Sequence, residues 1–187
     1  MTAIIIILCV MTYQRNNLWI DESVLWQDAV TKSPRKLRSW NNLGKLLTER
    51  ARYPEAINAF KKVIALDPTN SLAFMNIGVV YYRVGDVRQA IASYEKAIEF
   101  KPQYALAYLN LGLAYDDQGQ HQQALASYEK SLQLNPKIKE TYFYLGKAAI
   151  EAGNIELAVQ QLEALRQMKE TELAGRLDKR IRKVLDQ

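Results

Sequence analysis

A strict 34-residue period constrains the fold of this chain more than any other feature. Prolines mark the period at Pro34, Pro68, Pro102 and Pro136. Glycines and alanines follow it in three further series, which are Gly44, Gly78, Gly112 and Gly146, then Gly85, Gly119 and Gly153, then Ala56, Ala90, Ala124 and Ala158. A fixed period of about 20–50 residues indicates stacked repeats, none of which buries its apolar face alone.

Each repeat is predicted to be a pair of helices. Between Pro68 and Pro102, apolar side chains recur at helical spacing in two blocks, residues 72–82 and 87–98, and Gly85 separates the blocks. Glycine adopts, without a steric penalty, the left-handed conformation that ends many helices. Ala51 takes this place in the first repeat, where a left-handed backbone costs about 1 kcal/mol, so we expect a looser first turn.

Residue types at fixed places identify the repeat. Besides the alanines and prolines above, each repeat has an aromatic residue and an aliphatic–glycine pair, which are Trp40, Phe74, Tyr108 and Tyr142, then Leu43-Gly44, Ile77-Gly78, Leu111-Gly112 and Leu145-Gly146. The first three repeats have a second aromatic residue, Phe60, Tyr94 and Tyr128, whereas the last repeat has Leu162 in that place and Glu170 in place of the closing proline. Over residues 37–172 this pattern resembles the tetratricopeptide repeat (TPR) family. The resemblance implies an all-α fold, a right-handed α-solenoid of helical hairpins. Four repeats are expected, at 37–70, 71–104, 105–138 and 139–172.

The segments on either side of the repeats are also expected to be helical. Residues 20–36 form a lead-in helix in register with a second helix, but Glu22 stands where the later repeats have the close-packing alanine. No first helix is therefore expected to pack tightly against it. Residues 173–187 form a capping helix, whose apolar stripe is Leu173, Leu177, Ile181 and Leu185 and whose basic side chains face water. Binding of this basic helix to a membrane surface is the alternative.

Residues 1–19 contain an uncharged apolar run from Ala3 to Met11. Because a membrane-spanning helix needs about 20 apolar residues, this run is too short to cross a bilayer by itself. It is the apolar part of a signal peptide, a buried core helix, or the distal part of a transmembrane helix that begins upstream. We favour the third interpretation, since no basic residue precedes the run and it has no polar face. The segment is therefore expected to associate the protein with a membrane.

A second, shorter resemblance concerns the junction between this segment and the repeats. It rests on Tyr13-Gln14-Arg15-Asn16, Trp19, Leu25-Trp26, Ser33-Pro34 and Asn42-Leu43-Gly44. These residues look like the junction in bacterial multi-spanning membrane proteins with C-terminal TPRs, some of them similar to glycosyltransferases. The resemblance implies an alternative function, the substrate-positioning part of a membrane glycosyltransferase whose catalytic region is missing from this chain. It favours the non-cytoplasmic side, whereas the basic residues between 32 and 38 favour the cytoplasm, so the side stays open.

Composition argues against several classes of function. A hydrophobic content of 49% and a charged content of 24% indicate a folded chain. Most of the net charge of +5 lies in residues 1–52, which carry 8 basic and 4 acidic side chains, so no nucleic-acid-binding stripe is expected along the repeats. Cys9 is the only cysteine, which excludes an intramolecular disulfide and a cysteine-based zinc site.

No catalytic group is recognisable in the sequence. His121, the only histidine, is predicted to lie at an exposed turn. Asp116 and Asp117 are not expected to act as a catalytic pair, since residues one apart do not share a helix face. They are predicted to lie at a solvated helix end. Every glycine except Gly175 has a structural reason, so none is left for a phosphate-binding loop. We therefore expect no enzymatic activity, no cofactor, no metal and no small-molecule substrate.

A binding face is predicted instead, and the TPR resemblance places it on the first helices of the repeats. The sixth repeat position holds Asn42, Asn76 and Asn110, followed by Tyr144. These asparagines resemble the ladder in the superhelix of O-linked N-acetylglucosamine transferase, where side-chain amides hold the backbone of an extended peptide. An amide suits this role because it both donates and accepts hydrogen bonds. Alternatively, asparagine belongs only to the Asn-Leu-Gly signature of the repeat.

Apolar side chains surround these asparagines on the same helices, and they are Leu72, Met75, Val79, Leu106, Leu109 and Leu113. Exposed apolar patches usually mark a partner, although the same side chains are equally suited to packing between repeats. Tyr82 and Asp117 are also expected to face this groove. A clamp for a chaperone's C-terminal carboxylate is not expected, because only Asn76 matches its characteristic residues. The sequence thus predicts a membrane-tethered scaffold that binds a protein or an extended peptide.

Overall fold

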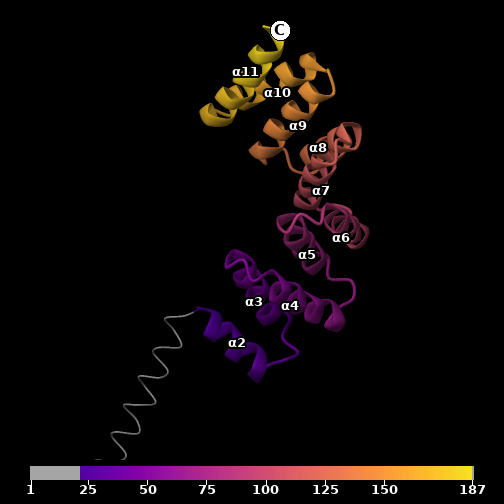
Figure 1. The fold of residues 1–187 in the computed structure, drawn as a ribbon, viewed down its shortest axis with the longest axis vertical. Helices are drawn as coiled ribbons and strands as arrows, with labels where there is room; N and C mark the ends of the chain where they lie inside the picture. Colours follow the sequence, from indigo (N-terminus) through magenta and orange to yellow (C-terminus); the bar gives the residue numbers. More distant parts are fainter. Residues whose placement is uncertain (1–21, 187) are drawn as a thin grey trace, which may run out of the picture. The chain divides into compact units, whose positions relative to one another are not determined.

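The structure is a computed structural model that describes residues 22–186, and this part of the chain contains ten α-helices and no β-strand (Figure 1). The helices are α2 (Glu22–Lys32), α3 (Leu37–Glu49), α4 (Tyr53–Leu66), α5 (Ser71–Arg83), α6 (Val87–Phe100), α7 (Ala105–Asp117), α8 (His121–Leu134), α9 (Lys139–Glu151), α10 (Ile155–Gln167) and α11 (Thr171–Leu185). The predicted all-α fold is confirmed. The predictions for residues 1–19 lie outside the described residues.

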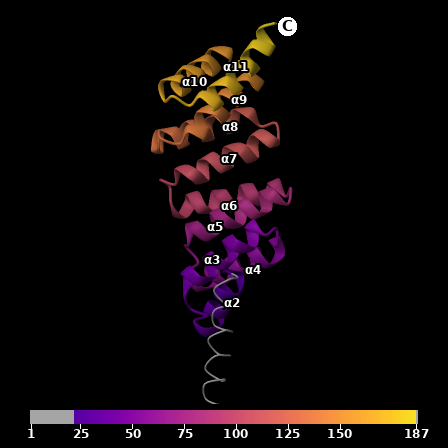
Figure 2. The same ribbon diagram turned by 90° about the vertical axis from the view of Figure 1, so that its left-hand side faces the viewer.

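The chain divides into two compact units, residues 1–80 and residues 81–187, with the boundary inside α5. In the first unit, α2 packs on α3, and α3 packs on α4. In the second unit, each helix from α6 to α11 packs on the next, and α11 also packs on α9 (Figure 2). Helical hairpins are therefore formed by α3 with α4, by α7 with α8 and by α9 with α10.

A contact between a glycine and an aromatic ring joins the two helices of a hairpin. A Cβ atom added at Gly44 would lie 2.6 Å from Cε1 of Phe60, and one added at Gly112 would lie 2.5 Å from Cε1 of Tyr128. Both rings are fully buried. The glycine of the Leu-Gly pair is thus required because the second aromatic ring occupies the space that any other side chain needs.

The turns that follow the α3, α5, α7, α9 and α10 helices share one hydrogen-bond pattern. The residue before the next helix donates its N–H to the carbonyl five residues earlier, in the pairs Arg52–Leu47, Asp86–Tyr81, Gln120–Tyr115, Asn154–Ala149 and Glu170–Leu165. The residue just before each donor has a positive φ, and this includes Ala51 at 57° and Lys169 at 61° as well as the predicted glycines. The Ala51 turn closes with a 2.8 Å bond, against 2.9 Å in the Gly85 turn. The expectation of a looser first turn is therefore wrong, and the alanine carries steric strain instead.

Helix α11 covers the last hairpin. A Cβ atom added at Gly146 would lie 2.6 Å from Cδ2 of Leu177, so α11 fills the place that an aromatic ring takes in earlier repeats. Leu177 and Ile181 are buried, but Leu185 is 66% exposed, so the apolar stripe ends one turn earlier than predicted. The guanidinium of Arg176 lies 4.6 Å from the centre of the Phe143 ring, which means that this basic side chain does not simply face water.

Helix α2 lies at the start of the first unit. The side chain of Glu22 is exposed and accepts a hydrogen bond of 3.1 Å from Nε1 of Trp26, one turn along the same helix. Val30, near the other end of α2, is 2% exposed. Glu22 therefore occupies its place without desolvation, since its carboxylate stays in water.

We predict that Gly112→Ala destabilises the protein and that Gly175→Ala does not. The added methyl group at Gly112 meets the buried Tyr128 ring, and such overpacking lowers the free energy of unfolding by about 1–3 kcal/mol. A Cβ atom at Gly175, inside α11, meets nothing within 4 Å, so the helix propensity of alanine raises the free energy of unfolding by about 0.5–1 kcal/mol. Denaturant midpoints measure both changes, and equal shifts in the two variants would contradict the glycine–ring contact.

Candidate protein-binding face

Two leucines at the same repeat position are exposed on the first helices. Leu72 in α5 is 43% exposed and Leu106 in α7 is 47% exposed. Each is followed four residues later by an asparagine, Asn76 and Asn110 respectively, so leucine and asparagine share one face of each helix. The same leucine–asparagine pair is therefore presented once in each unit.

The other predicted apolar residues are less accessible. Met75, Val79 and Leu113 are half-buried. Leu109 is 8% exposed and belongs to the core cluster of the second unit, so its predicted exposure in the groove is wrong. It points between the helices because α7 is flanked by both α8 and α9. The alternative of packing between repeats therefore holds for Leu109.

The three asparagines of the predicted ladder are all half-buried. Asn42 lines a recess of about 190 Å³ in the first unit, together with Glu22, Trp26, Lys45, Leu46 and Glu49 of α2 and α3. The Nδ2 atom of Asn76 is buried without a hydrogen-bond partner. Asn42 and Asn76 belong to the first unit and Asn110 to the second, so the ladder across all three stays a prediction.

A buried ion pair in the second unit was not predicted. The side chain of Asp116 is 2% exposed, with Oδ2 at 2.7 Å from Nζ of Lys147 and Oδ1 at 2.9 Å from Nδ1 of His121. The prediction of a solvated helix end is wrong for Asp116, and His121 is half-buried instead of exposed. The carboxylate is buried because it lies where α7, the start of α8 and α9 meet, and it links these three helices.

The spacing of oppositely charged residues in the sequence is a signal that could have predicted this ion pair. Asp116 and Lys147 are 31 residues apart, and so are Lys139 and Glu170, whose Nζ and Oε1 atoms are 3.0 Å apart. Opposite charges 31 residues apart, three fewer than the repeat length, therefore meet between the first helix of one repeat and the corresponding segment of the next. The sequence does not reveal which pair is buried, because that depends on the side chains around it.

Next to Asp116, a second polar contact involves the residues that were expected to face the groove. The hydroxyl of Tyr82 donates to Oδ2 of Asp117, and Asp117 is exposed. Burial, the hydrogen bond to Asp117 and the charge of that carboxylate raise the pKa of Tyr82 above its usual value. Tyr82 therefore keeps its proton at physiological pH and acts as a donor to Asp117.

A second tyrosine, Tyr128 of α8, lies within the electrostatic influence of Asp116 and Asp117. Its ring is stacked with that of Tyr144, with centroids 6.2 Å apart and an angle of 18° between the planes. Its hydroxyl is buried and has no hydrogen-bond partner. Burial, followed by the charge of Asp116 and the neighbouring Tyr82, Tyr144 and Asp117, raises the pKa of this hydroxyl. The hydroxyl is thus neutral, and its capacity to donate and to accept is unused.

Metal-binding groups and membrane-spanning helices are absent from the part of the chain that the structure describes. No three histidine, cysteine, aspartate or glutamate side chains gather there into a metal-binding group. Between residues 22 and 186, every helix is too short or too polar to cross a membrane.

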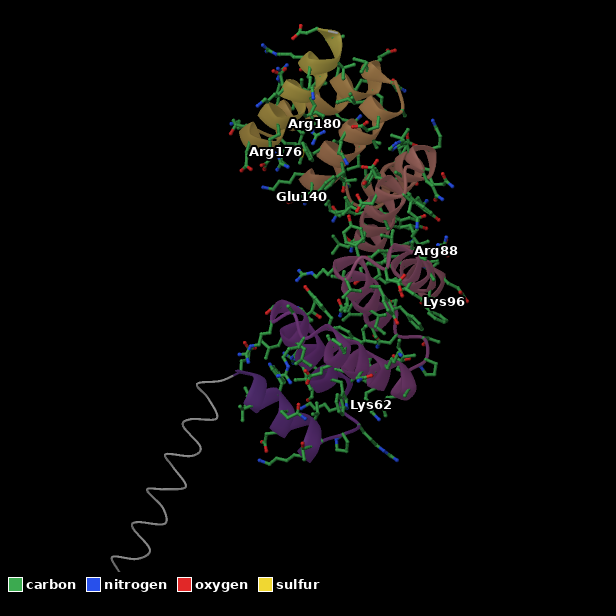
Figure 3. The ribbon with its side chains drawn as sticks, viewed as in Figure 1. Lys62, Arg88, Lys96, Glu140, Arg176 and Arg180 are labelled. Carbon is green, nitrogen blue, oxygen red and sulfur yellow. The ribbon has the colours of Figure 1, made fainter. Side chains whose placement is uncertain are left out.

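Side chains of both charge signs cover the second unit, and in Figure 3 Arg88 and Lys96 project from α6 to the right whereas Glu140 projects from α9 to the left.

Family models place the chain among known proteins. The model described as "TPR repeat" matches residues 44–85 and 85–119, and the one described as "Tetratricopeptide repeat" matches residues 105–138. The chain belongs to the tetratricopeptide repeat family. Its fold is that of an all-α TPR solenoid, and TPR domains typically serve as non-catalytic scaffolds for protein interactions.

Individual relatives share parts of the chain. A peroxisomal targeting signal receptor of Komagataella phaffii is 29% identical over 65 residues, which is 35% of this chain but only 11% of the receptor. A crystal structure of MamA is 27% identical, covers 79% of this chain and 86% of its own, and superposes with a TM-score of 0.70. The resemblance to glycosyltransferases is not tested by these relatives and stays a prediction.

Two further solved structures share the fold. TTC0263, a thermophilic TPR protein of Thermus thermophilus, is 23% identical with a TM-score of 0.69, and the match covers 93% of this chain and 95% of that one. The first TPR domain of Spaghetti (RPAP3), bound to the HSP90 peptide SRMEEVD, is 24% identical with a TM-score of 0.61 and covers 63% of this chain and 94% of its own.

We predict that Asp116→Asn lowers the free energy of unfolding by about 1–3 kcal/mol, because it removes the charge that Lys147 faces in a buried place. The double-mutant cycle of Asp116→Asn with Lys147→Met, measured by denaturant unfolding, gives the coupling of the pair, which we expect to be about 1–3 kcal/mol. Glu129→Gln, on the exposed side of α8, is the control and changes stability by less than about 0.5 kcal/mol. A coupling near zero would contradict the contact.

Proposed function

We propose that this chain is a protein-interaction scaffold that binds an extended protein segment along the first helices of its repeats. The observation that carries the proposal is the exposure of Leu72 and Leu106, at 43% and 47%, each with an asparagine one turn away. A single exposed leucine is ordinary, but a leucine exposed at the same place in two repeats, each beside an asparagine, supplies apolar contact together with an amide that pairs with any peptide backbone.

The relatives support a binding role. One of them is named as a receptor for a peroxisomal targeting signal, and another was solved with a peptide of HSP90. This chain lacks most of the residues of a carboxylate clamp, so its segment is expected to bind through backbone and side-chain contacts and not through a terminal carboxylate. The binding of an extended segment would also use Asn76, whose Nδ2 donor has no partner in the free protein.

Selection from a phage-displayed library of random nonapeptides on the immobilised full chain tests this proposal. We expect enriched peptides whose affinity falls at least about tenfold in the Asn76→Ala/Asn110→Ala variant, since each lost backbone hydrogen bond contributes about 0.5–1.5 kcal/mol. Far-UV circular dichroism should stay unchanged.

Asn58→Ala is the matched control for this experiment. Asn58 is exposed on α4, the second helix of its repeat, so its removal should leave the affinity as it is. Equal losses in the control and in the double variant, or no enrichment of peptides at all, would refute binding along the first helices.

We also propose that the apolar segment near the N-terminus attaches the scaffold to a membrane. The support is its sequence, an uncharged run that includes four consecutive isoleucines. We expect the full chain to stay in the membrane pellet after alkaline carbonate extraction, and the Ile5→Asp/Ile6→Asp variant to be released, since a charge in the bilayer centre costs about 2.5–3.5 kcal/mol per residue. Leu185→Asp, which alters an exposed apolar residue of α11, should not be released.

A further inference from the structure

The carboxylates of Asp116 and Asp117 are neighbours in sequence but differ in their partners. Asp116 uses one oxygen for Lys147 and the other for His121. Asp117 accepts a hydrogen bond from the Tyr82 hydroxyl, and no lysine, arginine or histidine of residues 22–186 pairs with it. Because the Asp116–Lys147 pair is neutral as a whole, Asp117 contributes an uncompensated negative charge at an exposed position.

Tyrosine rings and hydroxyls surround this charge. Tyr82 comes from the end of α5, Tyr144 from α9 and Tyr128 from α8, and all of them lie in the second unit. Tyr82 is close enough to Asp117, Tyr144 and Asp116 for their charges to raise its pKa, after the larger effect of burial. The rings of Tyr128 and Tyr144 are stacked. The place therefore combines a carboxylate that no cationic side chain neutralises with tyrosine side chains from three helices.

The Tyr128 hydroxyl is an independent sign of a ligand. Tyr128 is 0% exposed, and its hydroxyl is buried without a partner beside Asp116, Asp117, Tyr82 and Tyr144. A buried polar group without a hydrogen bond costs about 1–3 kcal/mol. An N–H donor of a ligand that displaces the side chains covering this hydroxyl would supply the missing hydrogen bond.

We propose that Asp117, Tyr82, Tyr144 and Tyr128 form a subsite for one basic side chain, a lysine or an arginine, of the peptide bound by the second unit. This inference rests on the proposed function. The carboxylate of Asp117 neutralises the cation, the tyrosine rings provide cation–π contacts, and the hydroxyl of Tyr128 accepts an N–H. An acidic side chain is repelled there, and an apolar one leaves the carboxylate without a counter-charge and the Tyr128 hydroxyl without a hydrogen bond.

The nonapeptide selection already described tests the subsite when its enriched sequences are compared between variants of the full chain. Wild-type protein should enrich lysine or arginine at one fixed peptide position at least about fivefold over the starting library. Asp117→Asn, which keeps the shape of the exposed side chain, should still capture peptides but lose this enrichment. Tyr82→Phe should reduce it, and Asp117→Lys should shift it to aspartate and glutamate. Glu129→Gln is the control and should keep the wild-type preference.

Affinity measurements on one selected peptide complete the test. Replacement of its basic residue by norleucine should weaken binding to the wild type at least about tenfold, and should change binding to Asp117→Asn by less than about twofold. Peptides captured by the wild type without any basic preference, or a preference that survives in Asp117→Asn, overturn the subsite but leave the proposed function standing. Capture of no peptide by the wild type overturns the proposed function and the subsite together.

Discussion

The packing of an aromatic ring against a bare glycine is the contact on which the hairpins depend. Phe60 lies over Gly44, and Tyr128 lies over Gly112, each in space that a Cβ atom would fill. A repeat protein has no single central core, so its stability comes from contacts within repeats and between neighbours. The same glycine–ring contact holds the helices together in the α3–α4 and α7–α8 hairpins. In the last hairpin the ring is absent, and Leu177 of α11 fills the place over Gly146, so the capping helix is part of this packing and not an addition to it.

This contact also links the core to the candidate subsite. In the first repeat the ring over the glycine is a phenylalanine, which ends within the apolar core. In the third repeat it is Tyr128, whose buried hydroxyl has no hydrogen-bond partner and whose pKa is raised by burial and by the charges of Asp116 and Asp117. A purely structural ring needs no hydroxyl in a buried place, since an unpaired one destabilises the fold. In the proposed subsite, the polar end of this core side chain connects stability with recognition.

Two ion pairs with the same spacing show how burial separates structural from incidental charges. Lys139 and Glu170 meet at 3.0 Å with side chains that are 44% and 29% exposed, and such accessible pairs contribute little. Asp116 meets Lys147 at 2.7 Å, but its side chain is only 2% exposed. Its loss leaves a buried group unpaired, which is costly. The same sequence spacing thus gives a minor surface contact between Lys139 and Glu170, whereas Asp116 and Lys147 form a buried ion pair that links three helices.

The sequence by itself determined the repeats, their family and the paired helices, because those features follow from local rules. Helical spacing of apolar residues, glycine at positive φ and the Leu-Gly pair act within a few turns of each helix. Leu72 and Leu106, which the sequence assigned to the groove, are exposed, but the groove itself stays a prediction. Only the tertiary structure decided that Leu109 and Asp116 are buried and that Leu185 is exposed. Burial depends on which side chains of neighbouring helices surround a residue, and a periodic pattern of one helix does not contain that information.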